Sequence, residues 1–166
     1  MQTLAGLAHV DFNQPGSASY EDVFDILRRL GADGNELEQQ FIRTAFNVVA
    51  RNQDDHPKNV SFLMDRDGQW RLSPAYDVSY AFNPVGEFTS RHQMSLNGKL
   101  ERFERADFEI ASRRAGLVQG RWSRLLDRVV DSVAEWPSVA EQVGVEPEKI
   151  KSIGASHRLD LGLTDR

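Results

Sequence analysis

Cysteine is absent from the 166-residue sequence. The chain therefore forms no disulfide and has no thiolate for metal binding or nucleophilic attack, which fits a reducing compartment. Long hydrophobic runs are missing as well, because none approaches the roughly 18 residues of a membrane span. The start, "MQTLAGLAHVDFNQPG", lacks the basic region and long apolar stretch of a signal peptide. We therefore expect a cytoplasmic protein that makes no contact with a membrane.

Positive charge is in short supply. The chain carries 20 Lys and Arg against 25 Asp and Glu, a formal net charge of −5. This balance disfavours binding along a phosphate backbone, although it leaves room for a local basic patch. The composition is otherwise that of a globular protein, with 40% hydrophobic residues. The length suits one domain with a real core, and no repeat divides it, so we expect a single domain over 1–166.

Helical periodicity dominates both ends of the chain. In "PGSASYEDVFDILRRLG" apolar residues recur every three to four positions, and Ser19 is placed to cap the helix. "NELEQQFIRTAFNVVARN" repeats this pattern, with Asn35 as the predicted cap. The later part of the chain has four further helical signals: 107–115, 121–135, a segment from Ser138, and a segment with Pro147 as its first residue. The tail after Leu161 is expected to fray.

The period changes between these two helical parts. "NVSFLM" and "QWRL" predict two short strands around the Asp-Gly turn of "DRDG", and Asn97-Gly98 signals a second hairpin. The residues before Asp54 are predicted to be helical throughout and offer no β-sheet lobe. The expected fold is therefore mainly α with a small β-hairpin element.

The stretch "RNQDDHPKNVSFL", residues 51–63, gathers charged side chains just before the first of these strands. Packed acidic groups repel each other, so the cluster costs free energy unless a cation or a reaction uses it. Asp54 and Asn59 have the D-x-x-x-x-N spacing with which protein kinases place a proton-accepting aspartate and a metal-binding oxygen on one loop. Asp77, in "SPAYD" beyond the second strand, is where a second metal-binding carboxylate is expected.

The same residues also have a purely structural interpretation. Asp54 and Asp55 would form a solvated loop, while Asn59 and Asp77 would cap turns. D-x-x-x-x-N alone occurs by chance in many chains, but the order of helix, loop, hairpin and "SPAYD" makes the kinase interpretation more specific. Asp55 lies four residues before Asn59, one too few for the kinase spacing, so Asp54 is the preferred catalytic residue.

"NQDDHPKNVSFL" followed by "GQWRLSPAYDVSYAF" resembles the signature of the HipA family, the serine/threonine-kinase toxins of bacterial toxin–antitoxin pairs. The D-x-H-x-x-N arrangement also resembles the catalytic loop of phosphatidylinositol-type kinases. "QTLAGLAHVDFNQPGSASYEDVFDILRRL" is similar to the stretch after the nucleotide hinge in HipA kinases, and "HQMSLNGKL" to a segment after their metal-binding aspartate. The resemblance covers nearly the whole chain and implies a kinase C-terminal lobe whose N-terminal lobe is absent.

The resemblance implies Mg²⁺ and ATP as cofactors. Asp54 would be the catalytic aspartate, and Asn59 and Asp77 would be the Mg²⁺ ligands and belong to the cofactor-binding site. Tyr76, also assigned to that site, would stack near the nucleotide or, in a plainer interpretation, belong to the core.

Two further loop residues are catalytic candidates by the same resemblance. His56 and Lys58 would face the phosphates or brace the loop. The plainer alternatives are a neutral imidazole bonded to loop carbonyls and a solvated lysine. Two other classes of function stay open. One is a metal-dependent hydrolase using Asp54, Asp55 and His56. The other is a non-catalytic interaction module that docks an antitoxin or a separate N-terminal lobe through the charged helices at 101–135.

A kinase also needs a clamp on the ATP phosphates, and the sequence has no glycine-rich phosphate loop; Gly98-Lys99 is followed by Leu100 rather than Ser or Thr. We therefore expect the isolated chain to bind Mg²⁺–ATP weakly and to transfer phosphate slowly or not at all. Without the second lobe, a face with Leu4, Leu7 and Phe12 is expected to be exposed.

The resemblance implies the partners as well. The phosphate acceptor would be a protein, an aminoacyl-tRNA synthetase in known family members. A HipB-like DNA-binding antitoxin would restrain the chain, DNA would be contacted only through that antitoxin, and a separate N-terminal lobe would complete the enzyme. No residue of the sequence names the substrate.

Overall fold

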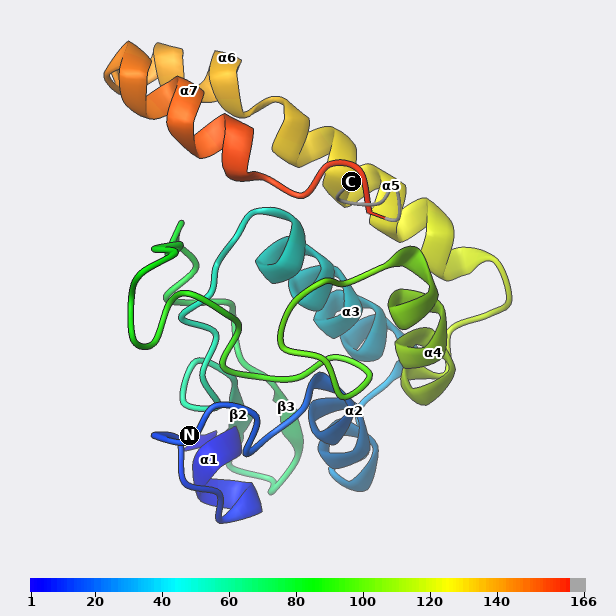
Figure 1. Ribbon diagram of the computed structural model, residues 1–166. Helices are drawn as coiled ribbons and strands as arrows, with labels where there is room; N and C mark the ends of the chain where they lie inside the picture. Colours follow the sequence, from blue (N-terminus) through cyan, green and yellow to red (C-terminus); the bar gives the residue numbers. More distant parts are fainter. Residues whose placement is uncertain (162–166) are drawn as a thin grey trace.

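The computed structural model describes residues 1–161, and the predicted frayed tail lies outside them. Figure 1 shows a helical body beside a small sheet, with a helical arm at one end. The elements in chain order are β1 (Gln2–Thr3), α1 (Leu4–Ala8), α2 (Tyr20–Arg29), α3 (Gly34–Val49), β2 (Ser61–Met64), β3 (Trp70–Leu72), α4 (Arg105–Ala115), α5 (Arg121–Ala134), α6 (Trp136–Gln142) and α7 (Pro147–Ser156). The predicted mainly helical fold with a small β element is confirmed.

The three strands form one antiparallel sheet in the order β1-β2-β3. β2 and β3 are the predicted hairpin, with Phe62 opposite Leu72. In their turn the Asp65 carboxylate accepts hydrogen bonds from two following backbone amides, and Gly68 takes a φ of 79° that favours glycine. β1 was not predicted, because two residues give no alternating pattern; Thr3 pairs with Ser61. The prediction that everything before the acidic loop is helical is wrong in this respect.

The second predicted turn is present without extended strands. Leu96 and Lys99 form an isolated antiparallel bridge, and the two residues between them, Asn97 and Gly98, both have positive φ. That is the geometry of a tight two-residue turn. The Asn97 side chain also donates to the buried Asp107 carboxylate at 2.9 Å, which ties the turn to the start of α4.

Helices α2 and α3 begin at capping boxes. At α2 the predicted cap is confirmed, since the Ser19 hydroxyl accepts from the Asp22 amide and the Asp22 carboxylate accepts from the Ser19 amide. α3 is capped in the same way by Asp33 and Glu36. The prediction of Asn35 as its cap is wrong, because Asn35 is exposed inside the first turn.

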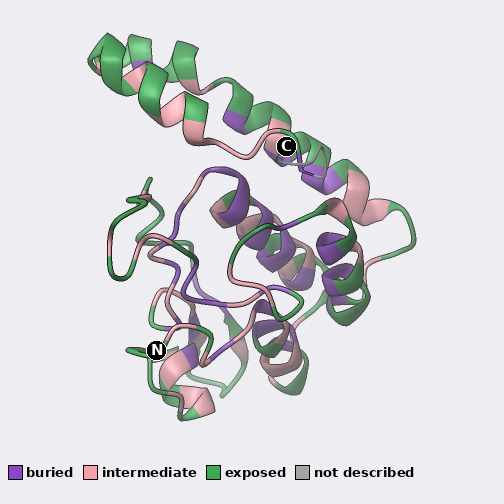
Figure 2. Ribbon diagram, in the orientation of Figure 1, coloured by how far each residue is buried: buried purple, intermediate pink, exposed green. Residues whose placement is uncertain are grey.

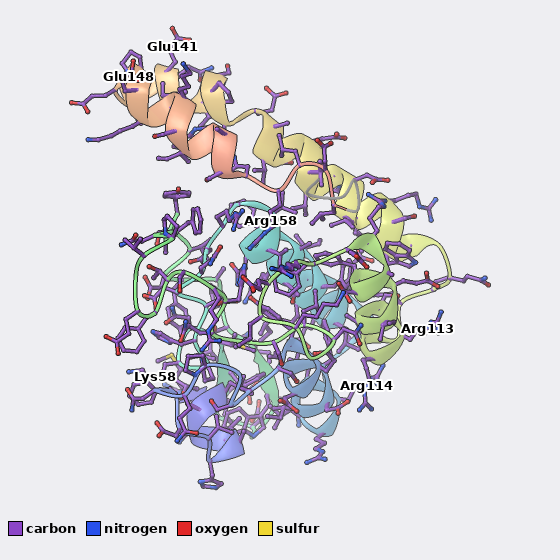
Figure 3. All side chains as sticks on the ribbon, in the orientation of Figure 1. Lys58, Arg113, Arg114, Glu141, Glu148 and Arg158 are labelled. Atoms are coloured by element: carbon purple, nitrogen blue, oxygen red, sulfur yellow. The ribbon has the colours of Figure 1, made fainter. Side chains whose placement is uncertain are left out.

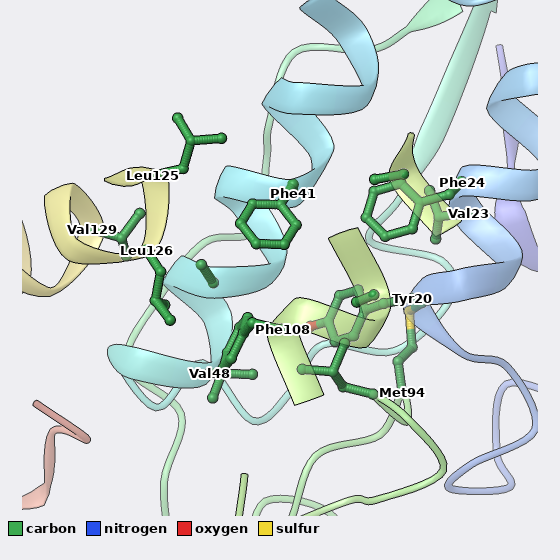
Figure 4. Close-up of a cluster of buried hydrophobic side chains, with 14 of the residues drawn as sticks. Tyr20, Val23, Phe24, Phe41, Val48, Met94, Phe108, Leu125, Leu126 and Val129 are labelled. Atoms are coloured by element: carbon green, nitrogen blue, oxygen red, sulfur yellow. The ribbon is translucent and has the colours of Figure 1, made fainter. Parts of the chain in front are cut away.

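Helix α3 runs through the middle of the helical body, where α2, α4 and α5 pack against it (Figures 1 and 2). The rings of Phe41 on α3 and Phe108 on α4 meet edge to face, with centroids 6.3 Å apart. Figure 4 shows the cluster around them. Its labelled members are the buried side chains Tyr20, Val23, Phe24, Phe41, Val48, Met94, Phe108, Leu125, Leu126 and Val129.

The prediction of an exposed apolar face is wrong for Leu4. Leu4 is fully buried, because β1 and α1 pack against the core beside β2. Leu7 is half-buried against the same core, and only Phe12 reaches the surface, with 36% of its area exposed.

The arm consists of α5, α6 and α7. The Arg121 guanidinium makes two hydrogen bonds of 2.7 and 2.8 Å to the Glu38 carboxylate and thereby joins α5 to α3. In α6, which begins at Trp136 rather than at Ser138, the Trp136 indole donates to the Ile150 carbonyl on α7. Within residues 1–161, no helix is both long and apolar enough to cross a membrane.

The charged helices at 101–135 satisfy much of their charge internally. Besides the bond from α5 to α3, Arg105 pairs with Asp127 at 2.7 Å and Arg113 with Glu109 at 2.8 Å. Such partly exposed pairs are typical of a solvated helix face. They give the interaction-module alternative no specific support.

We predict that Asp33→Ala lowers the free energy of unfolding by about 1 kcal/mol, because the Glu36 amide in the first turn of α3 loses its acceptor. Asn35→Ala is the matched control and is expected to change stability by less than about 0.5 kcal/mol. Urea unfolding followed by circular dichroism measures both. Equal losses for the two variants would show that the capping box does not stabilise this helix.

Candidate functional site

The acidic stretch forms the loop that leads from α3 to β2. Arg51, with a φ of 58°, turns the chain out of the helix. The loop is closed by a hydrogen bond of 2.8 Å from the Asn59 amide to the His56 carbonyl. It is also held from outside, because the Pro57 carbonyl accepts from the Ala5 amide at 3.0 Å. The hairpin and α1 together therefore fix this loop.

Asp55 is the anchor of the loop. Its side chain is buried, with 2% of the residue exposed. One carboxylate oxygen accepts from the Tyr20 hydroxyl at 2.5 Å and lies 2.7 Å from His92 Nδ1, and the other accepts from the Gln93 amide at 2.7 Å. The interpretation of Asp55 as part of a solvated loop is wrong, because these partners satisfy the carboxylate inside the protein.

These contacts set the ionisation of the buried groups. Burial would raise the pKa of Asp55, but the neighbouring His92, the Tyr20 hydroxyl and the Gln93 amide outweigh it and hold that pKa below its ordinary value. Burial, followed by the negative charge of Asp55, raises the pKa of Tyr20 well above its ordinary value. Tyr20 therefore keeps its proton and donates it in the bond to Asp55.

Asp54, the preferred catalytic residue, lies at the surface, unlike the buried Asp55. Its side chain is 49% exposed, and its Oδ1 lies 3.9 Å from His56 Nε2. Asn59 braces it from the other side of the loop, since the Asn59 side-chain amide donates to the Asp54 carbonyl at 2.9 Å. The Asn59 side-chain oxygen is then the atom left to face a cation.

Asn59 and Asp77 line one small pocket, with a cavity volume of about 30 Å³. Asp55 also lines it, whereas Asp54 is not among the lining residues. Three buried polar atoms of the lining have no hydrogen-bond partner among the described residues: the acceptors Gln40 Oε1 and Asn52 Oδ1 and the donor Arg43 Nε. A space of this size with both kinds of unsatisfied atom suits a water molecule or a hydrated ion.

The donor set fits magnesium better than a tightly held transition metal. Within residues 1–161, no group of three or more His, Cys, Asp or Glu side chains is placed to hold a metal ion. Asp77 would supply a carboxylate and Asn59 an amide oxygen, and Mg²⁺ commonly keeps several waters beside one or two protein carboxylates. The hydrolase alternative loses Asp55 as a ligand, because that carboxylate is engaged by Tyr20, His92 and Gln93.

The other predicted site residues surround the loop. Tyr76 is 38% exposed, so its assignment to the core is wrong; its hydroxyl bonds to Ser61 Oγ and to the Lys58 carbonyl and so ties the residue before Asp77 to the loop. Lys58 places its ammonium 3.5 Å from the centroid of the Phe12 ring, a cation–π contact.

His56 is only partly exposed, and its ring lies 6.4 Å from that of Phe12. The expected hydrogen bonds from its imidazole to loop carbonyls are not made through Nδ1, which is buried without a partner. His56 and Lys58 thus share one aromatic neighbour at the outer edge of the loop.

Sequence reasoning missed the residues that hold Asp55. Tyr20, His92 and Gln93 lie 35 to 38 positions away in the chain. His92 stands in a segment without any ligand spacing, and Tyr20 looks like an ordinary buried position of an amphipathic helix. The sequence offered one signal, the two adjacent acids on one loop. If either was buried, its charge needed partners from elsewhere in the chain.

The fold and the loop place the chain in a known family. A family model described as HipA-like C-terminal domain matches residues 1–137, and the chain belongs to that family. The resemblance stated from the sequence is thereby confirmed.

Two relatives illustrate the relationship. "Putative kinase Y4mE" of Sinorhizobium fredii (strain NBRC 101917 / NGR234) is 26% identical over 145 residues, which cover 81% of this chain and 32% of that protein. A solved complex of the toxin–antitoxin system HipA, HipB and operator DNA from Shewanella oneidensis MR-1 matches with a TM-score of 0.64 and 20% identity, over 83% of this chain and 33% of that one. That likeness shows the fold, and the chain spans about a third of the length of both relatives.

The ionisation of Asp55 predicts how stability depends on pH. Because its folded-state pKa is lowered, its contribution is fully present above its ordinary pKa, near 3.8, and is lost as the pH falls further through the folded value. We expect Asp55→Asn to lower the free energy of unfolding at neutral pH by about 2 kcal/mol. We also expect it to remove part of the wild-type loss of stability as the pH falls below about 4.

Asp54→Asn is the control for this prediction, since its half-exposed side chain should change stability by less than about 0.5 kcal/mol. Urea unfolding at a series of pH values compares the variants. A wild-type and an Asp55→Asn protein with parallel pH profiles would contradict the assignment of Asp55 as the buried carboxylate.

Proposed function

We propose that the chain is the C-terminal catalytic lobe of a HipA-type serine/threonine-protein kinase, transferring phosphate from ATP to a protein. The observation that carries this proposal is the shared pocket of Asn59 and Asp77 beside the loop of Asp54, in a member of the HipA-like C-terminal domain family. In a kinase these three positions supply the metal ligands and the proton acceptor.

Asp54 is the proposed catalytic residue. Its half-exposed carboxylate can reach an acceptor hydroxyl, orient it and take its proton. Asn59 has two tasks in this proposal, because its amide nitrogen braces the Asp54 carbonyl while its oxygen binds the metal. Magnesium, when bound with ATP, would neutralise charge that develops on the transferred phosphoryl group.

The neighbouring residues have supporting roles in the proposal. Tyr76 fixes the distance between the two metal ligands, because its hydroxyl bonds to the Lys58 carbonyl on the loop while its own backbone precedes Asp77. Lys58 and His56, packed about Phe12, would brace the outer edge of the loop and offer positive charge or hydrogen bonds to phosphates.

The partners belong to the proposal as well. A second lobe carrying a phosphate clamp would complete the ATP site, and a HipB-like antitoxin would restrain the kinase, as the assembly solved for the Shewanella protein suggests. DNA would be reached through that antitoxin. An aminoacyl-tRNA synthetase is the proposed class of acceptor, and the cytoplasm, where ATP and these partners meet, is the proposed compartment.

The metal site can be tested directly. We expect weak binding of Mg²⁺–ATP by the wild-type chain and an affinity lower by about tenfold or more in Asp77→Asn, because a charged ligand becomes neutral. Asp67→Asn, on the exposed hairpin turn, removes the same charge and should leave binding unchanged. Isothermal titration calorimetry, or NMR titration for weak binding, measures the difference. Equal affinities in wild type and Asp77→Asn would rule out Asp77 as a ligand.

The catalytic assignment has its own test. We expect slow or undetectable phosphate transfer by the isolated chain and faster transfer after addition of a matching N-terminal lobe. In that assembly Asp54→Asn should lower the rate by about a hundredfold or more while metal affinity stays near that of the wild type. Robust ATP-dependent phosphorylation by the isolated chain would refute the need for a second lobe.

A further inference from the structure

A series of hydrogen bonds through the buried His92 connects the segment after α7 with the acidic loop. Arg158, labelled in Figure 3, places its Nη1 2.9 Å from His92 Nε2. The other ring nitrogen, Nδ1, lies 2.7 Å from the Asp55 carboxylate. His92 is fully buried and packs edge to face on Phe103, so its ring is held in this bridging position.

The donor and acceptor groups decide where the hydrogens lie in this series of bonds. A guanidinium group only donates hydrogen bonds, so His92 Nε2 must accept the bond from Arg158. His92 Nδ1 then carries a hydrogen and donates to Asp55. His92 thus transmits the position of the Arg158 guanidinium at one end to the Asp55 carboxylate at the other.

The same end of α7 also holds the start of the loop. The Arg158 amide donates to the Val49 carbonyl at 2.9 Å, and its guanidinium donates to the Val48 carbonyl at 2.9 Å and to Gln53 Oε1 at 3.3 Å. In the opposite direction, Arg51 Nε donates to the Ser156 carbonyl at 2.8 Å. Both the last turn of α3 and the first loop residues are fastened to residues about a hundred positions later.

We propose that residues 156–158 position the catalytic loop, with Arg158 and His92 as positioning residues for Asp54. This inference rests on the proposed phosphoryl transfer. Asp55 directly follows Asp54 in the chain, so a shift of the backbone at the buried carboxylate also moves the carboxylate that would accept the proton. A displacement of about 1 Å at a reacting group can lower a rate by about a hundredfold. Arg158 lies beyond residues 1–137, which the family model matches.

The first test replaces Arg158 with alanine and uses Arg113→Ala, on the exposed face of α4, as the matched control. NMR of the folded wild-type chain should show His92 with hydrogen on Nδ1 and none on Nε2. In Arg158→Ala we expect the backbone amide resonances of the non-proline residues of 54–59 and of Gln93, which donates to Asp55, to move, while those of α2 stay in place. Arg113→Ala should move none of these.

A merely stabilising role gives a different result. If Arg158→Ala lowers the unfolding free energy but leaves the resonances of 54–59 and Gln93 in their wild-type positions, the positioning role is refuted. The amide shifts report the geometry of the folded protein, so a general loss of stability does not imitate the expected change.

A second pair of variants covers the case in which Arg158→Ala does not fold. His92→Gln keeps one donor and one acceptor on a neutral side chain, whereas His92→Leu keeps neither. We expect His92→Gln to retain wild-type-like resonances at Gln93 and 54–59 and His92→Leu to lose them. Equal behaviour of the two variants would overturn the proposal.

Magnesium titration separates this inference from the function on which it rests. If the wild-type chain binds Mg²⁺, Arg158→Ala should lower the affinity by about tenfold through displacement of Asn59 on the same loop. Unchanged affinity would refute the positioning role and leave the proposed function standing. If the wild-type chain binds neither Mg²⁺ nor Mg²⁺–ATP, the proposed metal site of Asn59 and Asp77 fails, and the resonances of the two variant sets still decide whether Arg158 positions the loop.

Discussion

The buried carboxylate of Asp55 is the constraint on which the site depends. An unpaired charge at this depth would cost several kcal/mol, so the protein must bring partners to it from elsewhere in the chain. Tyr20 from the start of α2 and His92 and Gln93 from the segment before α4 do this. Their convergence fixes the loop between α3 and β2. The orientation of Asp54 and His56, which flank Asp55 in the chain, follows from it.

Because Asp55 is held inside the protein, the carboxylate of the adjacent Asp54 stays accessible. Asp54 and Asp55 are adjacent, yet one is half-exposed and the other is buried. The loop thereby avoids the repulsion that two solvated acids would suffer at close range, and a single carboxylate is left on the side where a substrate could approach. The hairpin completes the arrangement by returning the chain to Asp77, with Tyr76 bonded back across the loop.

Much of the fold was predictable because it depends on local signals. Helical spacing gave α2 to α5, the Asp-Gly turn gave the β2–β3 hairpin, and the capping box at Ser19 was visible in the sequence. Asn35 was mistaken for a cap because an equally good cap, Asp33, stands two positions earlier. β1 escaped detection because two residues carry no period, and Leu4 was thought exposed because its burial depends on that strand.

By itself the sequence determined the family and the order of the proposed site, since Asp54, Asn59 and Asp77 are recognised by spacing along the chain. Only the tertiary structure decided which of the two adjacent acids is buried, and that Tyr76 is exposed while the Lys58 ammonium packs against the Phe12 ring. The physical reason is distance along the chain. The partners of Asp55, and Arg158 behind them, lie 35 or more positions from Asp55, and no local pattern encodes contacts that form only when the core assembles.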